Sequence, residues 1–191
     1  SKSISFSMAK SVVGLLTGIA IDEGLIQSVD DPVAKYLPEF ENKKYEITIR
    51  DLLTMISGLK WNESYYNPFS ETTKSYYGTN LDELVLKSKC KIPPTKQYEY
   101  IVVNPQVLSI IIKRLTNSTL SEYTSEKLWK PLGAKNDASW SLDQEGGSEK
   151  ATCCFNSNAR DFARLGQLVL NKGKWNGKQL ISESYLKEAL T

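Results

Sequence analysis

The 191-residue sequence contains no histidine. Its absence excludes a Ser-His-Asp triad, a Cys-His dyad and a histidine-ligated metal site built from these residues. Any nucleophile here must be activated by another base. Lysine and tyrosine are the remaining candidates that could take its proton.

Cysteine is also scarce. Cys90, Cys153 and Cys154 make an odd number and form no C-x-x-C pair, so we expect neither a zinc site nor a redox pair. Adjacent cysteines rarely bridge each other. We therefore expect Cys153 and Cys154 to be small buried residues rather than reactive thiols.

Blocks of charge and long apolar runs are missing as well. The net charge of +2 is spread along the chain, and no basic block is interleaved with aromatic residues, so nucleic acid is not an expected partner. The longest apolar stretch, residues 12–21, is too short and too often interrupted to span a bilayer. With 40% hydrophobic and 24% charged residues, the composition is that of a globular protein.

The apolar pattern that is present is mainly helical. Val12, Leu15, Leu16 and Ile19 recur at intervals of three and four, which predicts a helix over residues 7–23. A capping box over residues 48–51 predicts a helix through residue 55, and similar signals predict helices over 81–88, 104–116, 120–129, 158–171 and from 182 onward. Residues 60–80 are polar and aromatic and predict a long irregular loop, and residues 61–79 within it are a candidate wall of a substrate cleft.

The first predicted helix opens with an S-x-x-K tetrad, Ser7 to Lys10. Residues three apart lie on one face of a helix, so the lysine can reach the serine hydroxyl. Burial and a helix N-terminus both disfavour an ammonium ion, so this site could hold a neutral amine. The same N-terminus presents backbone N–H groups to a developing oxyanion.

The tetrad by itself is a weak signal, because it recurs in the chain, for example at residues 57–60 and 184–187. Only Ser7 opens a long apolar helix in which a lysine could be desolvated. A plain helix N-cap remains the competing interpretation of Ser7.

Tyr100 is the second candidate, a phenol in a loop that enters a helix and could relay a proton beside Lys10. A packed aromatic is the alternative for this one tyrosine among ten. Asn104, followed by Pro105, has an alternative role as a helix cap. Arg160 and Asp161 lie one turn into a predicted helix, and we expect them to be structural.

The order of these segments resembles the class C β-lactamase-related serine hydrolases, which include penicillin-binding esterases and 6-aminohexanoate-dimer hydrolases. The resemblance runs through nearly all of the chain and rests on SFSMAKS (5–11), GIAIDEGLIQSVDDPVAKYLPEF (18–40), TIRDLLTMISGLKW (48–61), the tyrosine region (98–143) and NARDFARLGQLVLNKGKWNGKQLIS (158–182). The segments TMISGLKW and DFARLGQLVLNKGKWNGKQ are most similar in sequence to the 6-aminohexanoate-dimer-hydrolase-like branch.

The resemblance implies an α+β fold of the β-lactamase/transpeptidase type. It implies that Ser7 is the acylated nucleophile, that Lys10 is its base, and that Tyr100 assists proton transfer to the leaving group. β-Lactamases proper place an asparagine two residues after the tyrosine, where this chain has Val102. Asn104, four residues on as in the hydrolase branch, is then a candidate substrate-binding residue, and β-lactamase activity is disfavoured.

The family's sheet is built from the two ends of its chain, and a third motif on a sheet strand supplies a second oxyanion N–H. We find neither that motif nor the leading segment in this sequence. Residues 1–191 are therefore expected to form one partial hydrolase domain, truncated at both ends and mostly the helical subdomain.

The expected reaction is hydrolysis of a small-molecule amide or ester through an acyl-enzyme, with no metal and no organic cofactor. One alternative is a β-lactamase or D-alanyl-D-alanine carboxypeptidase with the same residues. The other is a penicillin-binding sensor that is acylated without turnover or has lost catalysis. The sequence leaves localisation open, although exported relatives suggest a periplasmic or extracellular site.

Overall fold

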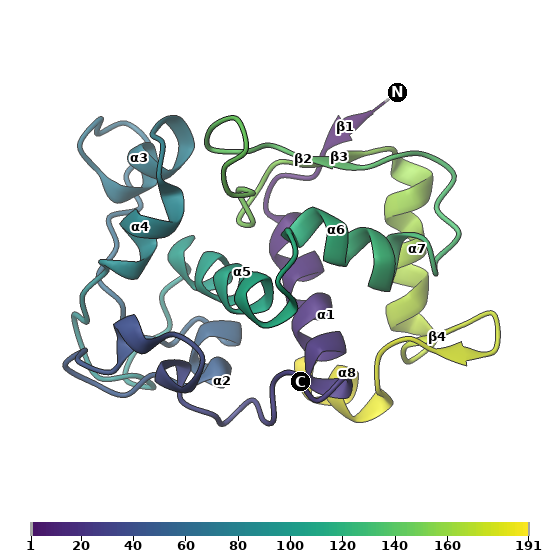
Figure 1. Ribbon diagram of the computed structural model, residues 1–191, viewed down its shortest axis with the longest axis horizontal. Coiled ribbons are helices and arrows are strands. Elements are labelled where there is room, and N and C mark those ends of the chain that lie inside the picture. The colour runs from purple at the N-terminus through teal and green to yellow at the C-terminus, as the bar shows by residue number, and fades with distance from the viewer. Residues whose placement is uncertain (1, 191) are drawn as a thin grey trace.

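The computed structural model describes residues 2–190, and helix α1 (Met8–Asp22) runs through the middle of the molecule (Figure 1). The predicted apolar stripe is buried: Val12, Leu16 and Ile19 are each less than 5% exposed. Helix α5 (Val103–Thr116) packs against α1. These two helices hold most of the central core, because both have residues of nearly every turn buried.

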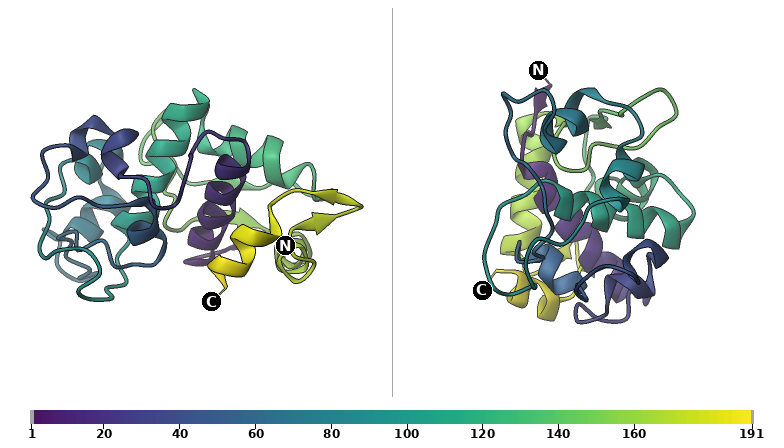
Figure 2. Two further views of the ribbon diagram at one scale, coloured as in Figure 1. Left: turned by 90° about the horizontal axis from the view of Figure 1, so that it is seen from below. Right: turned by 90° about the vertical axis from the view of Figure 1, so that its left-hand side faces the viewer.

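The other helices surround this pair. They are α2 (Ile49–Leu53), α3 (Glu71–Tyr77), α4 (Leu81–Leu86), α6 (Leu120–Thr124), η3 (Ser125–Trp129), α7 (Ala159–Leu170) and α8 (Glu183–Ala189), with short turns η1 (Val33–Lys35) and η2 (Pro38–Phe40). Helices α3 and α4 lie on one side of α1, and α7 with the last hairpin lies on the other (Figures 1 and 2).

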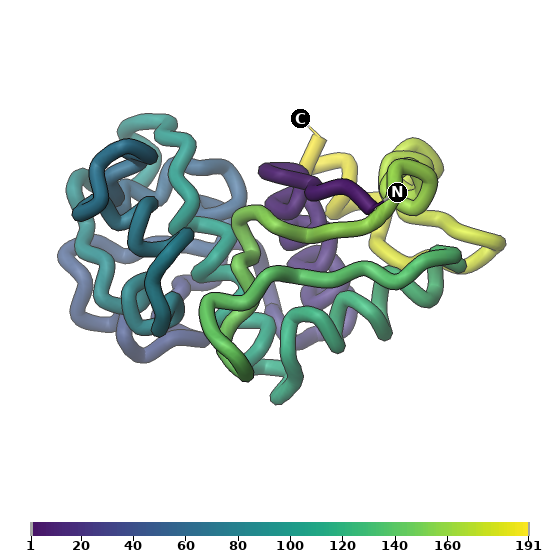
Figure 3. Tube along the Cα trace, turned by 90° about the horizontal axis from the view of Figure 1, so that it is seen from above, coloured from purple at the N-terminus to yellow at the C-terminus, as the bar shows by residue number. Residues whose placement is uncertain are grey.

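Two small antiparallel sheets complete the fold. Strands β1 (Ser3–Ile4), β3 (Phe155–Ser157) and β2 (Ser139–Trp140) pair in the order β1-β3-β2, with Ser3 opposite Ser157. Strands β4 (Lys174–Trp175) and β5 (Lys178–Gln179) form a separate hairpin. Figure 3 shows the first strand beside a segment about 150 residues later in the chain. The expected α+β, mostly helical architecture is confirmed.

Local capping signals predict some helix starts and miss others. The capping box between Thr48 and Asp51 is present, with both of its reciprocal bonds. The expectation that Asn104 caps α5 is wrong: the helix begins at Val103, and Val102 occupies the cap position. Pro105 still lies in the first turn, where its missing N–H costs no helical hydrogen bond.

Residues 60–80 are not one irregular loop, because α3 lies within them. Ser70 caps this helix, its hydroxyl oxygen accepting from the Thr73 N–H at 3.1 Å. The helix has few aliphatic residues, so an apolar period could not reveal it. Polar capping and the burial of Thr72 and Ser75 hold it in place.

The prediction for the adjacent cysteines is half right. Cys153 and Cys154 are buried, as expected, but a disulfide joins them, so the expectation that they do not bridge is wrong. Cys154 has a φ of +67°, a conformation that L-residues rarely adopt. Among the described residues, Cys90 is the free cysteine.

Asp161 has the expected structural role. Its carboxylate accepts hydrogen bonds from the Lys135 and Asn136 N–H groups at 3.0 and 3.1 Å and from the Asn158 side chain at 2.7 Å. Burial opposes ionisation, but these bonds outweigh it and hold the pKa of Asp161 well below its ordinary value. The carboxylate therefore ties the start of α7 to the turn after η3.

Asp161→Asn is expected to lower the free energy of unfolding by about 2–4 kcal/mol, because the amide replaces an acceptor with a donor against buried N–H groups. Since the native pKa is lowered, the wild-type advantage should be present at neutral pH and should shrink as pH falls through the carboxyl range. Urea unfolding at several pH values measures this. Asp137→Asn, an exposed neighbour, is the control, and equal stability of the two variants would contradict the assignment.

Candidate functional site

Ser7 lies in a tight turn between β1 and α1. The Ser5 N–H donates to the Phe155 carbonyl at 2.8 Å, which fixes the turn to β3. Phe6 then adopts a φ of +47°, a costly conformation of the kind that clusters at functional sites. Ser7 occupies the N-cap position of α1, yet its side chain makes no capping hydrogen bond. The exposed hydroxyl is thus left available for another partner.

That partner is Lys10. The Lys10 Nζ lies 3.1 Å from the Ser7 Oγ and donates to the Thr152 carbonyl at 2.6 Å. The helix supplies the first contact through the three-residue spacing, whereas the loop before β3 supplies the second. Two fixed contacts hold the flexible lysine side chain with its amine beside the serine oxygen.

Tyr100 completes the group. The Lys10 Nζ lies 5.1 Å from the centre of the Tyr100 ring, and the Tyr100 side chain is 45% exposed. Tyr100 precedes α5, so the approach of α5 to α1 brings it to the N-terminal end of α1. The structure therefore brings Ser7, Lys10 and Tyr100 together, as the sequence predicted.

Asn104 does not join them. It is wholly buried, and the Ser57 hydroxyl donates to its Oδ1 at 2.7 Å while its Nδ2 faces the Met55 sulfur at 3.4 Å. This packing favours a structural role for the amide, which links α5 to the end of the α2 segment. Substrate binding by Asn104 stays a prediction.

Two further residues at this site were missed in the sequence. Thr152 acts through its main-chain carbonyl, which leaves no side-chain pattern to find. Glu63, in the loop after Trp61, accepts the Val102 N–H at 2.5 Å. Burial raises the pKa of Glu63, and hydrogen bonds from Val102 and Thr72 together with attraction to Lys10 oppose that rise.

Tyr65 and Tyr76 lie next to Glu63, and these two residues together with Tyr66, Phe69 and Tyr100 are called the aromatic rim. The rings of Tyr65 and Tyr76 meet edge to face at 5.8 Å. Burial, with the neighbouring Tyr76, Glu63 and Tyr100, raises the pKa of Tyr65 to about 12, so its phenol stays protonated at neutral pH. Tyr66 and Phe69 in the same loop are exposed at 99% and 80%. The loop thus presents exposed aromatic side chains next to Tyr65.

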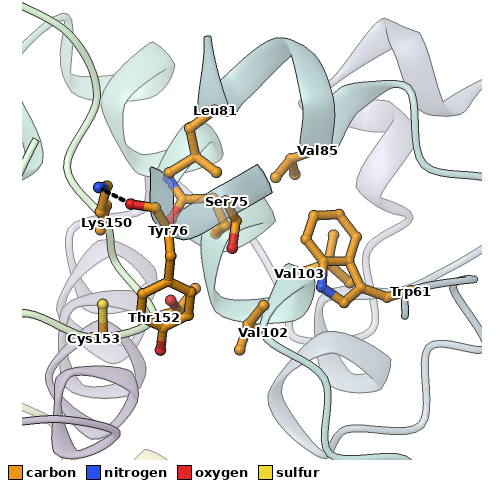
Figure 4. Close-up of a pocket in the computed structure, with 11 residues that line it drawn as sticks. Trp61, Ser75, Tyr76, Leu81, Val85, Val102, Val103, Lys150, Thr152 and Cys153 are labelled. Atoms are coloured by element: carbon orange, nitrogen blue, oxygen red, sulfur yellow. Dashed lines mark hydrogen bonds between the residues drawn. The ribbon is translucent and has the colours of Figure 1, made fainter. Parts of the chain in front are cut away.

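A small pocket lies beneath this rim (Figure 4). Its lining includes Trp61, Tyr76, Val102 and Thr152, and Figure 4 shows the Tyr76 ring beside Thr152. The Lys150 Nζ donates to the Tyr76 carbonyl at 2.6 Å, which fixes the end of α3 to the loop that carries Thr152. The aromatic rim and the Lys10 acceptor therefore belong to one connected assembly.

A larger, mainly apolar groove of about 970 Å³ opens along α1. Residues of α1, α2, α5, α7 and α8 line it, and Lys10 is among them. Lys10 therefore lies between this groove and Ser7.

Within residues 2–190, no group of three or more Cys, Asp or Glu side chains is placed to hold a metal ion. The described helices include none with the length and apolarity needed to cross a membrane.

Comparison with known proteins identifies relatives along the whole chain. The Beta-lactamase family profile matches residues 4–189. The 6-aminohexanoate-dimer hydrolase of Paenarthrobacter ureafaciens is 30% identical over 195 residues, which cover 96% of this chain and 49% of that protein.

Solved structures agree. A candidate 6-aminohexanoate-dimer hydrolase from Bacillus anthracis superposes with a TM-score of 0.86 at 25% identity, over 98% of this chain and 52% of that one. A family VIII carboxylesterase shares the fold with a TM-score of 0.79 at 20% identity, over 98% of this chain and 60% of that one. The chain spans about half the length of the relatives it matches. With the match extending from residue 4 to residue 189, the chain belongs to the Beta-lactamase family, whose members include serine hydrolases.

Proposed function

We propose that the protein containing this chain hydrolyses a small amide or ester through an acyl-enzyme on Ser7. The observation that carries the proposal is the 3.1 Å contact between the Ser7 Oγ and the Lys10 Nζ. A serine at a helix N-terminus ordinarily bonds to the backbone of its own helix. Ser7 does not, and its oxygen instead faces a potential base.

In this proposal, Lys10 in its neutral form takes the Ser7 proton while the Ser7 Oγ bonds to the substrate carbonyl carbon. The resulting oxyanion lies at the N-terminus of α1, where the Ser7 N–H has no hydrogen-bond partner among the described residues and is free to donate. Lys10, with Tyr100 as relay, returns a proton to the leaving amine or alcohol as its bond to carbon breaks. Water then attacks the acyl-enzyme by the reverse route and releases the acid.

The substrate class is inferred from the rim and from the relatives. Tyr65, Tyr66, Phe69 and Tyr100 offer aromatic surface, which suits an acyl or leaving group with apolar or flat parts. The Paenarthrobacter relative is named for the hydrolysis of a 6-aminohexanoate dimer. The aromatic surface suits either class of substrate, whereas the relative's name supports an amide or ester over a strained lactam.

The test uses the intact protein with a fluorophosphonate, p-nitrophenyl esters, short amides and nitrocefin. We expect an adduct on Ser7 in the mass spectrum, turnover of esters or amides, and slow or no nitrocefin hydrolysis. Nitrocefin as the best substrate would establish the β-lactamase alternative. A stable β-lactam adduct on Ser7 without turnover of any substrate would establish the sensor. A folded protein with no Ser7 adduct would overturn the nucleophile assignment.

A further inference from the structure

The Glu63 carboxylate joins the rim loop to the segment that carries Tyr100. Its Oε1 accepts the Val102 N–H, two residues after Tyr100, at 2.5 Å. The Thr72 side chain lies close enough to Glu63 to lower the pKa of the carboxyl, and the Thr72 Oγ1 accepts from the Trp61 indole N–H at 2.9 Å. The carboxylate thus lies next to α3 and holds the backbone that leads into α5.

Several titratable groups surround Glu63. Lys10 on α1 attracts its charge, and the phenols of Tyr65, Tyr76 and Tyr100 lie close enough to interact with it or with one another. Lys10 becomes the cation among them when it takes the Ser7 proton. Each of the other named groups is neutral when protonated, so Glu63 supplies the negative charge that faces Lys10 in this set.

We propose that Glu63 is a positioning residue for acyl transfer: it fixes the Val102 backbone that places Tyr100, and its carboxylate stabilises the Lys10 ammonium that forms when Ser7 is deprotonated. The proposal rests on the proposed function of Ser7 and Lys10. Glu63 touches neither substrate nor Ser7 and acts through Lys10 and Tyr100.

The physical reason is that positive charge develops on the base during the reaction. The base at this site gains a positive charge as the nucleophile attacks, in partly buried surroundings where charges interact more strongly than in water. A carboxylate beside a base lowers the energy of its protonated form, as the aspartate does for histidine in Ser-His-Asp hydrolases. A chain without histidine can obtain the same effect from Glu63 and Lys10.

Two variants separate the charge from the hydrogen bond. In Glu63→Gln the amide oxygen can still accept the Val102 N–H, but the negative charge is gone. We expect the plateau kcat to fall about tenfold with KM nearly unchanged, as the loss of one charge interaction predicts. The pH profile of kcat should also differ from that of wild type, because the charge of Glu63 no longer acts on the groups that surround it.

Glu63→Asp keeps the charge but shortens the reach to Val102. We expect the pH profile of wild type with a reduced kcat. Glu71→Gln is the matched control, since Glu71 is a carboxylate at the start of α3 that accepts the Asn62 N–H at 3.2 Å. It should leave both kcat and the pH profile as in wild type.

The measurements are kcat, KM and the Ser7 fluorophosphonate labelling rate from about pH 6 to about pH 10, with thermal unfolding for every variant. If folded Glu63→Gln kept the kcat and the pH profile of wild type, the proposed role of the Glu63 charge would be overturned. The assignment of Ser7 as nucleophile would stand. If Glu63→Gln does not fold, Glu63→Asp decides, and wild-type kcat there would overturn the anchoring of Val102. Absence of Ser7 labelling in wild type would instead remove the proposed function itself.

Discussion

Ser7→Ala should reduce kcat by about 10⁴-fold or more, the loss that follows when the nucleophile of a covalent mechanism is removed. No other side-chain hydroxyl among residues 2–190 is hydrogen-bonded to the Lys10 Nζ, whose partners are the Ser7 Oγ and a main-chain carbonyl. KM should change little, since the remaining surfaces that bind substrate are intact. Steady-state kinetics on the best ester or amide substrate measures both.

The same variant separates the two interpretations of Ser7 through stability. Loss of a side chain that caps a helix costs about 1 kcal/mol of stability. The Ser7 hydroxyl makes no capping bond. The free energy of unfolding of Ser7→Ala should therefore stay within about 0.5 kcal/mol of wild type. Ser11→Ala, an exposed serine on the next turn of α1, is the matched control and should keep full activity. A stable Ser7→Ala with nearly normal kcat would show that the nucleophile lies elsewhere.

Lys10→Arg should reduce kcat by about 10²–10⁴-fold, the range that general-base catalysis contributes. Arginine keeps the positive charge but does not lose its proton in proteins, so it cannot accept one from Ser7. The rate of Ser7 labelling should fall in parallel with kcat, because both need a deprotonated serine. Labelling kinetics and turnover at several pH values provide the measurement.

Lys10→Met removes charge and base together, while Lys130→Met does so at an exposed position at the end of η3. If Lys10 acts as the base, its two variants should be similarly slow and Lys130→Met should match wild type. If Lys10→Arg instead keeps wild-type activity, the lysine contributes only charge. The base would then have to be sought among the tyrosines.

Local signals determined a large part of this protein. The three-and-four apolar spacing predicted α1, the capping box predicted α2, and the S-x-x-K spacing placed the Lys10 amine beside Ser7. These features depend on residues within one or two helical turns, so neighbouring positions in the chain contain the needed information. The absence of histidine also means that any base drawn from these 191 residues is a side chain other than imidazole.

Only the tertiary structure decided what surrounds that pair. The carbonyl that accepts a hydrogen bond from Lys10 belongs to Thr152, 142 residues away. The carboxylate that accepts the Val102 N–H belongs to Glu63, on another segment. It also showed that Asn104 is buried against Ser57 and that Cys153 is bonded to Cys154. Such contacts form when distant segments pack, and main-chain acceptors and packed amides leave no spacing in the sequence. The sequence by itself therefore determined the candidate nucleophile and its helix, whereas long-range packing decided how the candidate base is held and which groups face it.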